Sequence, residues 1–220
     1  MGNLPYDVAH LLGTSVLVLS FGLLFQRRIL GVLNIFGVQA GFLAAAAAWQ
    51  AHIQHAPHLY ITAAIALVFK AIVIPLALRR IVFRLRIHRT VETVLGVGPT
   101  MIAGVGLVGL SVILVLPLTH QSVALTRDDL ALALSIVLLG LLMMITRRNA
   151  VTQVVGFMSL ENGLILAAVG VAGMPLVVEM SVAFSVMVAF IIFGIFFFHI
   201  RDRFDTLDLQ SLESFRGERS

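Results

Sequence analysis

Two polar sites interrupt otherwise apolar stretches of this 220-residue chain, and both contain side chains that can carry a proton. Lys70 lies within LVFKAIVIPL, and Glu161 with Asn162 lies within GFMSLENGLIL. A lysine at the centre of a bilayer costs about 2.5–3.5 kcal/mol on insertion scales, so we expect it to face a partner or water. A buried carboxylate takes up or releases a proton as neighbouring charges change. The pattern predicts Lys70, Glu161 and Asn162 as proton-transfer candidates.

Pro75 follows Lys70 by five residues and predicts a helix break. Its ring clashes with the carbonyl of Ala71, and it has no N–H to donate to that carbonyl. We expect the freed carbonyl to accept a hydrogen bond from the Lys70 ammonium or from a water. Interrupted helices that carry an ionisable side chain occur in ion pathways. The alternative is that Lys70 extends to the membrane surface or forms one static ion pair.

Small residues surround the second polar site. Gly156, Ser159 and Gly163 flank Glu161 and Asn162 in sequence, and residues of this size permit close helix approach in a membrane. The alternative to proton transfer is that the Glu–Asn pair joins helices through static hydrogen bonds.

Glu179 is a weaker proton-transfer candidate. It falls in the first turn of a later apolar stretch, just after Pro175. A carboxylate there complements the positive end of a helix. We therefore favour capping over a place at a proton entrance or exit.

A run of histidines, His52, His55 and His58, has the three-residue spacing that can present imidazoles to a metal. No carboxylate or thiolate accompanies the run, and Pro57 interrupts any helix through it. We expect solvated loop histidines and no metal site.

The composition predicts a lipid environment. The chain is 60% apolar and 12% charged, with a mean hydropathy of +1.04, whereas soluble domains are about 45–50% apolar and about 25% charged. The net charge of +4 is read as a sign of membrane orientation, not of nucleic-acid binding.

Several kinds of chemistry are excluded. The absence of cysteine removes disulfides, thiolate zinc sites and iron–sulfur clusters held by this chain. We find no nucleophile elbow and no phosphate-binding loop. We expect no catalytic residues, no cofactor and no metal.

Apolar runs of membrane-spanning length predict an all-α integral membrane protein with seven transmembrane helices, its N-terminus outside and its C-terminus cytoplasmic. The predicted spans are 8–25, 30–50, 59–79, 97–118, 129–146, 150–171 and 176–199. This topology places 13 of the 15 basic residues on the cytoplasmic side, as the positive-inside rule requires. They are Arg27, Arg28, Arg79, Arg80, Arg84, Arg86, Arg89, Arg147, Arg148, Arg201, Arg203, Arg216 and Arg219.

The spans group as three, one and three. We predict an N-terminal three-helix unit over 1–90, a connecting fourth helix within 91–128, a C-terminal three-helix unit over 129–200 and a cytoplasmic tail over 201–220. The first span of each triplet is followed by an Arg-Arg pair, Arg27-Arg28 and Arg147-Arg148, 120 residues apart. This spacing suggests a parallel repeat.

The stretch RRNAVTQVVGFMSLENG, followed by a span and then by TLDLQSLESFRG, resembles the membrane component E of hydrogenase 4. That family is related, through its last three helices, to the small membrane subunit K of respiratory complex I. The resemblance runs nearly end to end. It is most specific at Arg147-Arg148-Asn149, Glu161-Asn162-Gly163, Leu207-Asp208 with Arg216-Gly217, and Lys70 with Pro75.

The resemblance implies a non-catalytic subunit of a complex I-like or nickel–iron hydrogenase assembly in a prokaryotic cytoplasmic (inner) membrane. Its partners would be antiporter-like membrane subunits that move protons or Na⁺, and a soluble redox arm. The small complex I subunits carry two buried glutamates, which would fall at Met158 and near Ala189 here. Glu161, one turn after Met158, can substitute for the first. No acidic residue of the seventh span replaces the second glutamate. Lys70, in the first triplet, can compensate for its absence.

Three functions follow from these patterns. The first is a proton-coupling subunit that uses Lys70 and Glu161. The second is a structural anchor or scaffold of the same assembly. The third is a stand-alone transporter.

Overall fold

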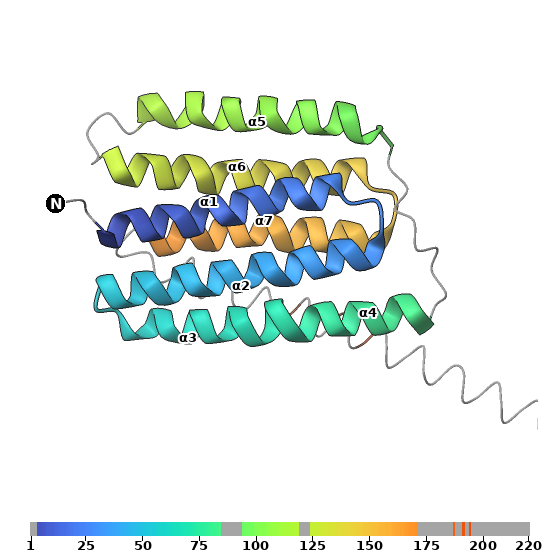
Figure 1. Ribbon diagram of the computed structural model, residues 1–220, viewed down its shortest axis with the longest axis horizontal. Coiled ribbons are helices and arrows are strands. Elements are labelled where there is room, and N and C mark those ends of the chain that lie inside the picture. Colours follow the sequence, from blue (N-terminus) through green and yellow to red (C-terminus); the bar gives the residue numbers. More distant parts are fainter. Residues whose placement is uncertain are drawn as a thin grey trace, which may run out of the picture.

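The computed structural model describes residues 4–84, 94–118 and 124–170, together with the isolated positions 187, 191 and 194. The described segments are helical, without strands (Figure 1). The elements are α1 (Leu4–Phe25), α2 (Ile29–Ile53), α3 (Pro57–Ile65), the π-helix η1 (Ala66–Val73), α4 (Ile74–Arg84), α5 (Val97–Leu118), α6 (Ala124–Thr146) and α7 (Ala150–Gly170). Helices suit these apolar stretches because a helix satisfies its own backbone groups where no water is present.

The described part of the chain contains six helices that are long and apolar enough to cross a membrane. They are Leu4–Phe25, Ile29–Ile53, Pro57–Phe83, Val97–Val115, Asp129–Thr146 and Ala150–Gly170. They correspond to the first six predicted spans. Apart from the isolated positions 187, 191 and 194, the seventh predicted span lies outside the described residues, as do Glu179 and the tail over 201–220.

Two helical hairpins form the centre of the bundle. One is α1–α2 and the other is α6–α7, and α1 packs against α6 while α2 packs against α7 (Figure 1). The continuous rod α3–η1–α4 covers the outer side of α2, and α5 covers α6. Large buried side chains fill the interior, among them Leu23, Phe36, Leu43, Ile136 and Met143.

Glycines bring the two helices of the second hairpin into backbone contact. A Cβ atom at Gly140 would lie 2.5 Å from the backbone nitrogen of Leu160. One at Gly163 would lie 2.9 Å from the carbonyl oxygen of Ala133, and one at Gly156 would lie 3.1 Å from the backbone nitrogen of Met144. The close helix approach predicted from Gly156 and Gly163 is confirmed.

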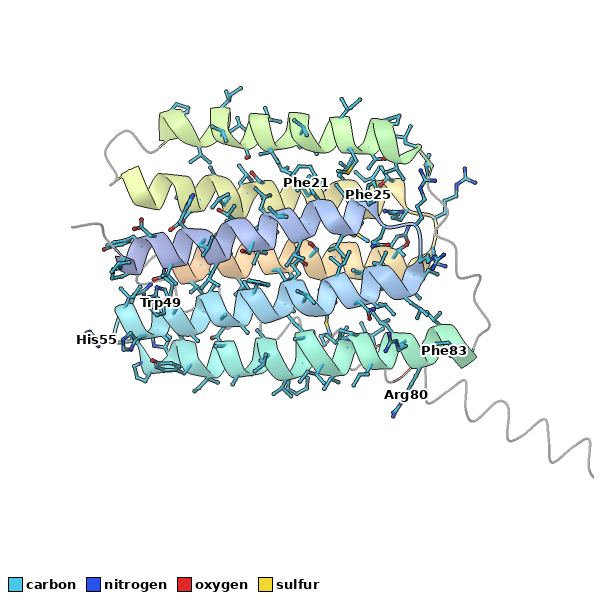
Figure 2. All side chains as sticks on the ribbon, in the orientation of Figure 1. Phe21, Phe25, Trp49, His55, Arg80 and Phe83 are labelled. Atoms are coloured by element: carbon cyan, nitrogen blue, oxygen red, sulfur yellow. The ribbon has the colours of Figure 1, made fainter. Side chains whose placement is uncertain are left out.

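Basic residues gather at one end of the bundle. Both hairpin linkers, 26–28 and 147–149, lie at the same end as the last turn of α4 (Figure 1). Each linker has three residues and contains an Arg-Arg pair, and α4 adds Arg79 and Arg80. In Figure 2, Arg80 and Phe83 mark this end, whereas Trp49 and His55 mark the opposite end. This segregation of charge agrees with the pattern used to predict orientation.

The histidine run lies across the turn between α2 and α3. His55 has a left-handed backbone (φ 51°), and the Ala56 N–H donates to the Ala51 carbonyl at 3.1 Å. These features form a Schellman C-cap of α2. His52 therefore lies in the last turn of α2 and His58 in the first turn of α3, and all three imidazoles are exposed. Within the described ranges, no three His, Cys, Asp or Glu side chains are grouped to hold a metal ion.

Candidate functional site: a buried ion pair and its hydrogen-bond network

The two polar sites predicted from the sequence meet inside the bundle. Lys70 of η1 and Glu161 of α7 form an ion pair, with 3.2 Å between Lys70 Nζ and Glu161 Oε2. The two side chains are 1% and 3% exposed. Each residue lies near the middle of its apolar helix. Two charges so far from water require each other, since an isolated buried charge is much more costly than a paired one.

Asn162 holds Lys70 from a second direction. Lys70 Nζ donates to Asn162 Oδ1 at 2.9 Å, and Asn162 Nδ2 donates to Gln39 Oε1 at 3.3 Å. The third predicted candidate is thus a direct partner of the first. Asn162 also connects the ion pair to α2, because Gln39 lies at the middle of that helix.

Gln39 extends the network to the first hairpin. Its Nε2 donates to Ser20 Oγ at 2.7 Å and to Ser159 Oγ at 3.0 Å. Ser20 Oγ in turn donates to the Val16 carbonyl at 3.0 Å. Gln39, Ser20 and Ser159 are buried. The polar network therefore joins four elements, namely α1, α2, η1 and α7.

Gln39 is not among the residues predicted from the sequence. A signal was present, because Gln39 lies at the centre of an apolar stretch between Gly37 and Gly41, in GVQAG. Glu161 and Asn162 have the same setting of small neighbours. A neutral amide is less costly in lipid than a charge, so its presence is less diagnostic.

Lys70 lies within a π-helical segment of its rod. Residues 66–73 are π-helical, and the Ile74 N–H donates to the Phe69 carbonyl five residues earlier. Pro75 is the second residue of the α-helix that follows, so the expected interruption is a π segment within one continuous rod. Short π segments are frequent at functional sites because they redirect side chains.

The Ala71 carbonyl does not accept the hydrogen bond from Lys70 that was expected from the sequence. A Cβ atom at Gly37 would lie 3.1 Å from the Ala71 oxygen, so this carbonyl lies against α2. The polar partners of Lys70 are Glu161 and Asn162 instead.

A third buried charged side chain, besides Lys70 and Glu161, lies at the basic end of the bundle. Arg147 is 1% exposed, and its Nη2 donates to the carbonyls of Leu23 at 3.1 Å and Leu24 at 2.6 Å. A cation at these carbonyls complements the negative C-terminal end of α1. Burial lowers the pKa of the Arg147 guanidinium, which remains charged at neutral pH. Its Nε and Nη1 have no hydrogen-bond partner among the described residues.

The rest of the Arg147-Arg148-Asn149 motif shapes the start of α7. Asn149 Oδ1 accepts a hydrogen bond from the Val151 N–H at 2.9 Å, which is the geometry of an N-cap. Gln153 Nε2 donates to the Arg147 carbonyl at 2.9 Å. Arg148 is exposed. The motif thus connects α1 to the hairpin that carries Glu161.

A small cavity of about 20 Å³ lies at the other end of the bundle, lined by residues that include Gln50, Asp129 and Val169. This volume accommodates about one water molecule. Val169 follows Glu161 by eight residues on α7, or about 12 Å along the helix axis. The cavity is therefore separate from the ion pair.

Across the described residues, the arrangement is a helical bundle with six helices of membrane-spanning length and a buried, hydrogen-bonded Lys–Glu pair. Comparison with known proteins adds a relative of unknown function. The chain is 26% identical, over 219 residues, to a Mycobacterium tuberculosis protein named uncharacterized protein Rv0085. The alignment covers 98% of this chain and 100% of that protein. No protein-family profile matches the chain. No solved structure matches it.

Proposed function

We propose that the chain is a membrane subunit of a complex I-like or nickel–iron hydrogenase-type assembly and contributes to proton or Na⁺ translocation through Lys70 and Glu161. In this proposal it spans a prokaryotic cytoplasmic membrane seven times, with its N-terminus outside. Its partners are antiporter-like membrane subunits and a soluble redox arm. The choice of assembly rests on the sequence resemblance to the hydrogenase-4 component E family.

The observation that carries the proposed ion transfer is the direct contact between two ionisable side chains at the middle of the bundle. The 3.2 Å between Lys70 Nζ and Glu161 Oε2 allows a proton to pass from the ammonium to the carboxylate without an intermediate group. This step converts an ion pair into a neutral pair. A charge that moves in a neighbouring subunit would shift the balance between the two states.

The hydrogen-bond network supplies the orientation that such a step needs. Asn162 Oδ1 accepts from Lys70, and Gln39 fixes the Asn162 amide from the other side. The Lys70 nitrogen is therefore oriented toward the Glu161 carboxylate by contacts from a second side. This arrangement favours proton transfer as the role of Lys70 over the alternative that its side chain extends to the membrane surface.

A structural role for the same pair is the second candidate function. Buried ion pairs also specify which helices meet, and Lys70 and Glu161 join helices that are far apart in the sequence. A scaffold subunit would need this contact for assembly only. A stand-alone transporter is the third candidate.

The first experiment addresses the assembly. The tagged chain is purified from its native membrane in mild detergent, and the proteins that remain bound are identified by mass spectrometry. We expect antiporter-like subunits together with a redox subunit. Purification of the chain alone, under conditions that preserve other membrane complexes, would contradict the proposed assembly and favour a stand-alone transporter.

The second experiment separates transfer from scaffolding. The purified assembly is reconstituted in vesicles, and ion transport per electron is measured for Glu161→Gln, Lys70→Met and the conservative Glu161→Asp. We expect Glu161→Gln and Lys70→Met to assemble with normal subunit stoichiometry and to transport less per electron, whereas Glu161→Asp retains part of the transport.

Arg80→Gln is the matched control, because it removes an exposed charge that extends away from the bundle (Figure 2). Arg80→Gln should leave both the subunit stoichiometry and the ion transport per electron unchanged. Normal transport by Glu161→Gln and Lys70→Met would contradict a transfer role. Loss of assembly without a change in the transport of the remaining complexes would identify a scaffold.

A further inference from the structure

A groove on the outside of the bundle lies between α2 and the η1–α4 part of the rod. Its volume is about 440 Å³, and its lining includes Asn34, Gly37, Val38, Ile72 and Arg79. The volume is within the range of small-molecule sites. Gly37 lines the groove where α2 and the rod come closest, since a Cβ atom there would lie 3.1 Å from the Ala71 carbonyl oxygen.

One end of the groove is positively charged. Arg79 Nη2 donates to Asn34 Oδ1 at 3.1 Å, which places the guanidinium at the mouth of the groove. Among the described residues, no carboxylate lies within ion-pair distance of Arg79. A guanidinium has five N–H donors in a planar fork, a geometry that suits a phosphate group.

The rest of the groove is apolar and open to the outside of the bundle. Val38 is 52% exposed, Ile72 is 50% exposed and Leu76 is 52% exposed. These three side chains belong to helices of membrane-spanning length, so in a bilayer they face acyl chains. Arg79 lies toward the end of the same span, where the headgroup region begins.

We propose that this groove binds an anionic phospholipid, whose phosphate contacts Arg79 beside Asn34 and whose acyl chain lies over Gly37 between Val38 and Ile72. The charge at one end and the apolar lining along the rest match the two parts of a lipid molecule. Basic pockets between membrane helices are recognised sites for anionic headgroups. The proposal requires a chain in a bilayer and is independent of ion translocation.

The groove and the ion pair lie on opposite sides of the same π segment. Ala71 lines the groove, and the preceding residue, Lys70, points to the opposite side, toward Glu161. A bound acyl chain would therefore contact the π segment on the side opposite to the ion pair. Lipid bound at this site would stabilise the helix geometry that holds Lys70.

The test is native mass spectrometry of the full chain, purified in mild detergent and titrated with phosphatidylglycerol or with phosphatidylcholine of the same acyl chains. We expect the wild type to retain phosphatidylglycerol in preference to phosphatidylcholine. Arg79→Gln should lower phosphatidylglycerol retention about five- to tenfold, which corresponds to the loss of one phosphate-bound arginine.

Arg80→Gln is the matched control, because it removes the same charge at the next position but lines no part of the groove. It should retain phosphatidylglycerol as the wild type does. A second variant, Val38→Trp, fills the apolar part and should lower retention of both lipids. Circular dichroism checks that every variant is folded.

Three results would overturn the proposal. One is equal retention by Arg79→Gln and Arg80→Gln, which would indicate a diffuse charge effect. Another is an absence of headgroup preference in the wild type. The last is displacement of the lipid by inorganic phosphate alone, together with unchanged retention by Val38→Trp, which would identify an anion site without a place for the acyl chain.

Discussion

The hairpins α1–α2 and α6–α7 are alike in length, in linker and in direction, but they differ in how their helices pack. In α6–α7, glycines bring the backbones together, and a Cβ atom at Gly140 would collide with Leu160. In α1–α2, side chains separate the helices, and a Cβ atom at Gly22 would lie 3.5 Å from Ile35, an ordinary contact distance.

The two hairpins also differ in the kind of polar residue that they bury. The closely packed hairpin carries the ionisable Glu161 with Asn162, whereas the other carries the neutral Ser20 and Gln39. Backbone contact leaves a helix little freedom to slide or rotate. The hairpin with backbone contact, α6–α7, thus carries the Glu161 carboxylate. The hairpin α1–α2 contributes Gln39, which accepts a hydrogen bond from Asn162.

The hairpin linkers also differ, although their sequences look alike. Arg27 and Arg28 are exposed, as is Arg148, whereas Arg147 is buried against the end of α1. The second linker therefore holds the first hairpin at the C-terminal carbonyls of α1. Equal residue types at equivalent positions have different surroundings here, one on the surface of the bundle and one inside it.

The largest expected effect is the loss of one member of the ion pair. Glu161→Leu should lower the free energy of unfolding by about 3–5 kcal/mol, because it leaves the Lys70 ammonium buried without its counter-charge. The double variant Lys70→Met with Glu161→Leu should recover most of this loss. Equilibrium unfolding in detergent micelles measures both. A double variant as unstable as the single one would mean that the charges do not compensate each other.

The next effect concerns the hairpin packing itself. Gly140→Ala should destabilise the protein by about 3 kcal/mol, because the new Cβ atom would lie 2.5 Å from the Leu160 nitrogen and force the helices apart. Gly22→Ala is the matched control in the other hairpin. It should be neutral, or stabilising by up to about 1 kcal/mol, since alanine favours helix. Thermal unfolding of the two variants in the same detergent measures the difference, and equal effects would remove the contrast between the hairpins.

The linker comparison predicts a smaller effect. Arg147→Met should cost about 2 kcal/mol, because the carbonyls of Leu23 and Leu24 lose charge-assisted hydrogen bonds. Arg148→Met, one residue later and exposed, should change stability by less than about 0.5 kcal/mol. Denaturant unfolding of both variants measures these values. Similar costs for the two arginines would show that Arg147 acts only as a surface charge.

The smallest effect lies outside both hairpins. His55→Gly should raise the free energy of unfolding by about 0.5–1 kcal/mol, because glycine adopts the left-handed C-cap conformation without a Cβ penalty. His52→Gly, in the last helical turn of α2, should be destabilising instead. The melting temperature of each variant relative to the wild type measures the sign, and stabilisation by both would contradict a cap-specific effect.

The network could be predicted from the sequence in part. Lys70 and Glu161 stand out because lipid strongly disfavours charged side chains at the middle of a span, and Asn162 stands out because it adjoins Glu161. Gln39, Ser20 and Ser159 do not stand out to the same extent, because isolated neutral polar residues are common in membrane helices. The inward position of Arg147 also escaped prediction, since an arginine after a span is normally a surface charge.

Composition and residue order alone determined the helical class, the extent of the six described apolar helices and the residues that must avoid lipid. Each of these follows from the cost of placing a residue in lipid, which depends on the residue itself. Only the tertiary structure decided that Lys70 contacts Glu161, that Gln39 completes the network and that Arg147 points inward. These contacts depend on helix rotation, on the π segment at 66–73 and on glycine-mediated spacing. The rotation and spacing of packed helices are properties of two helices together, so the sequence of one helix does not determine them.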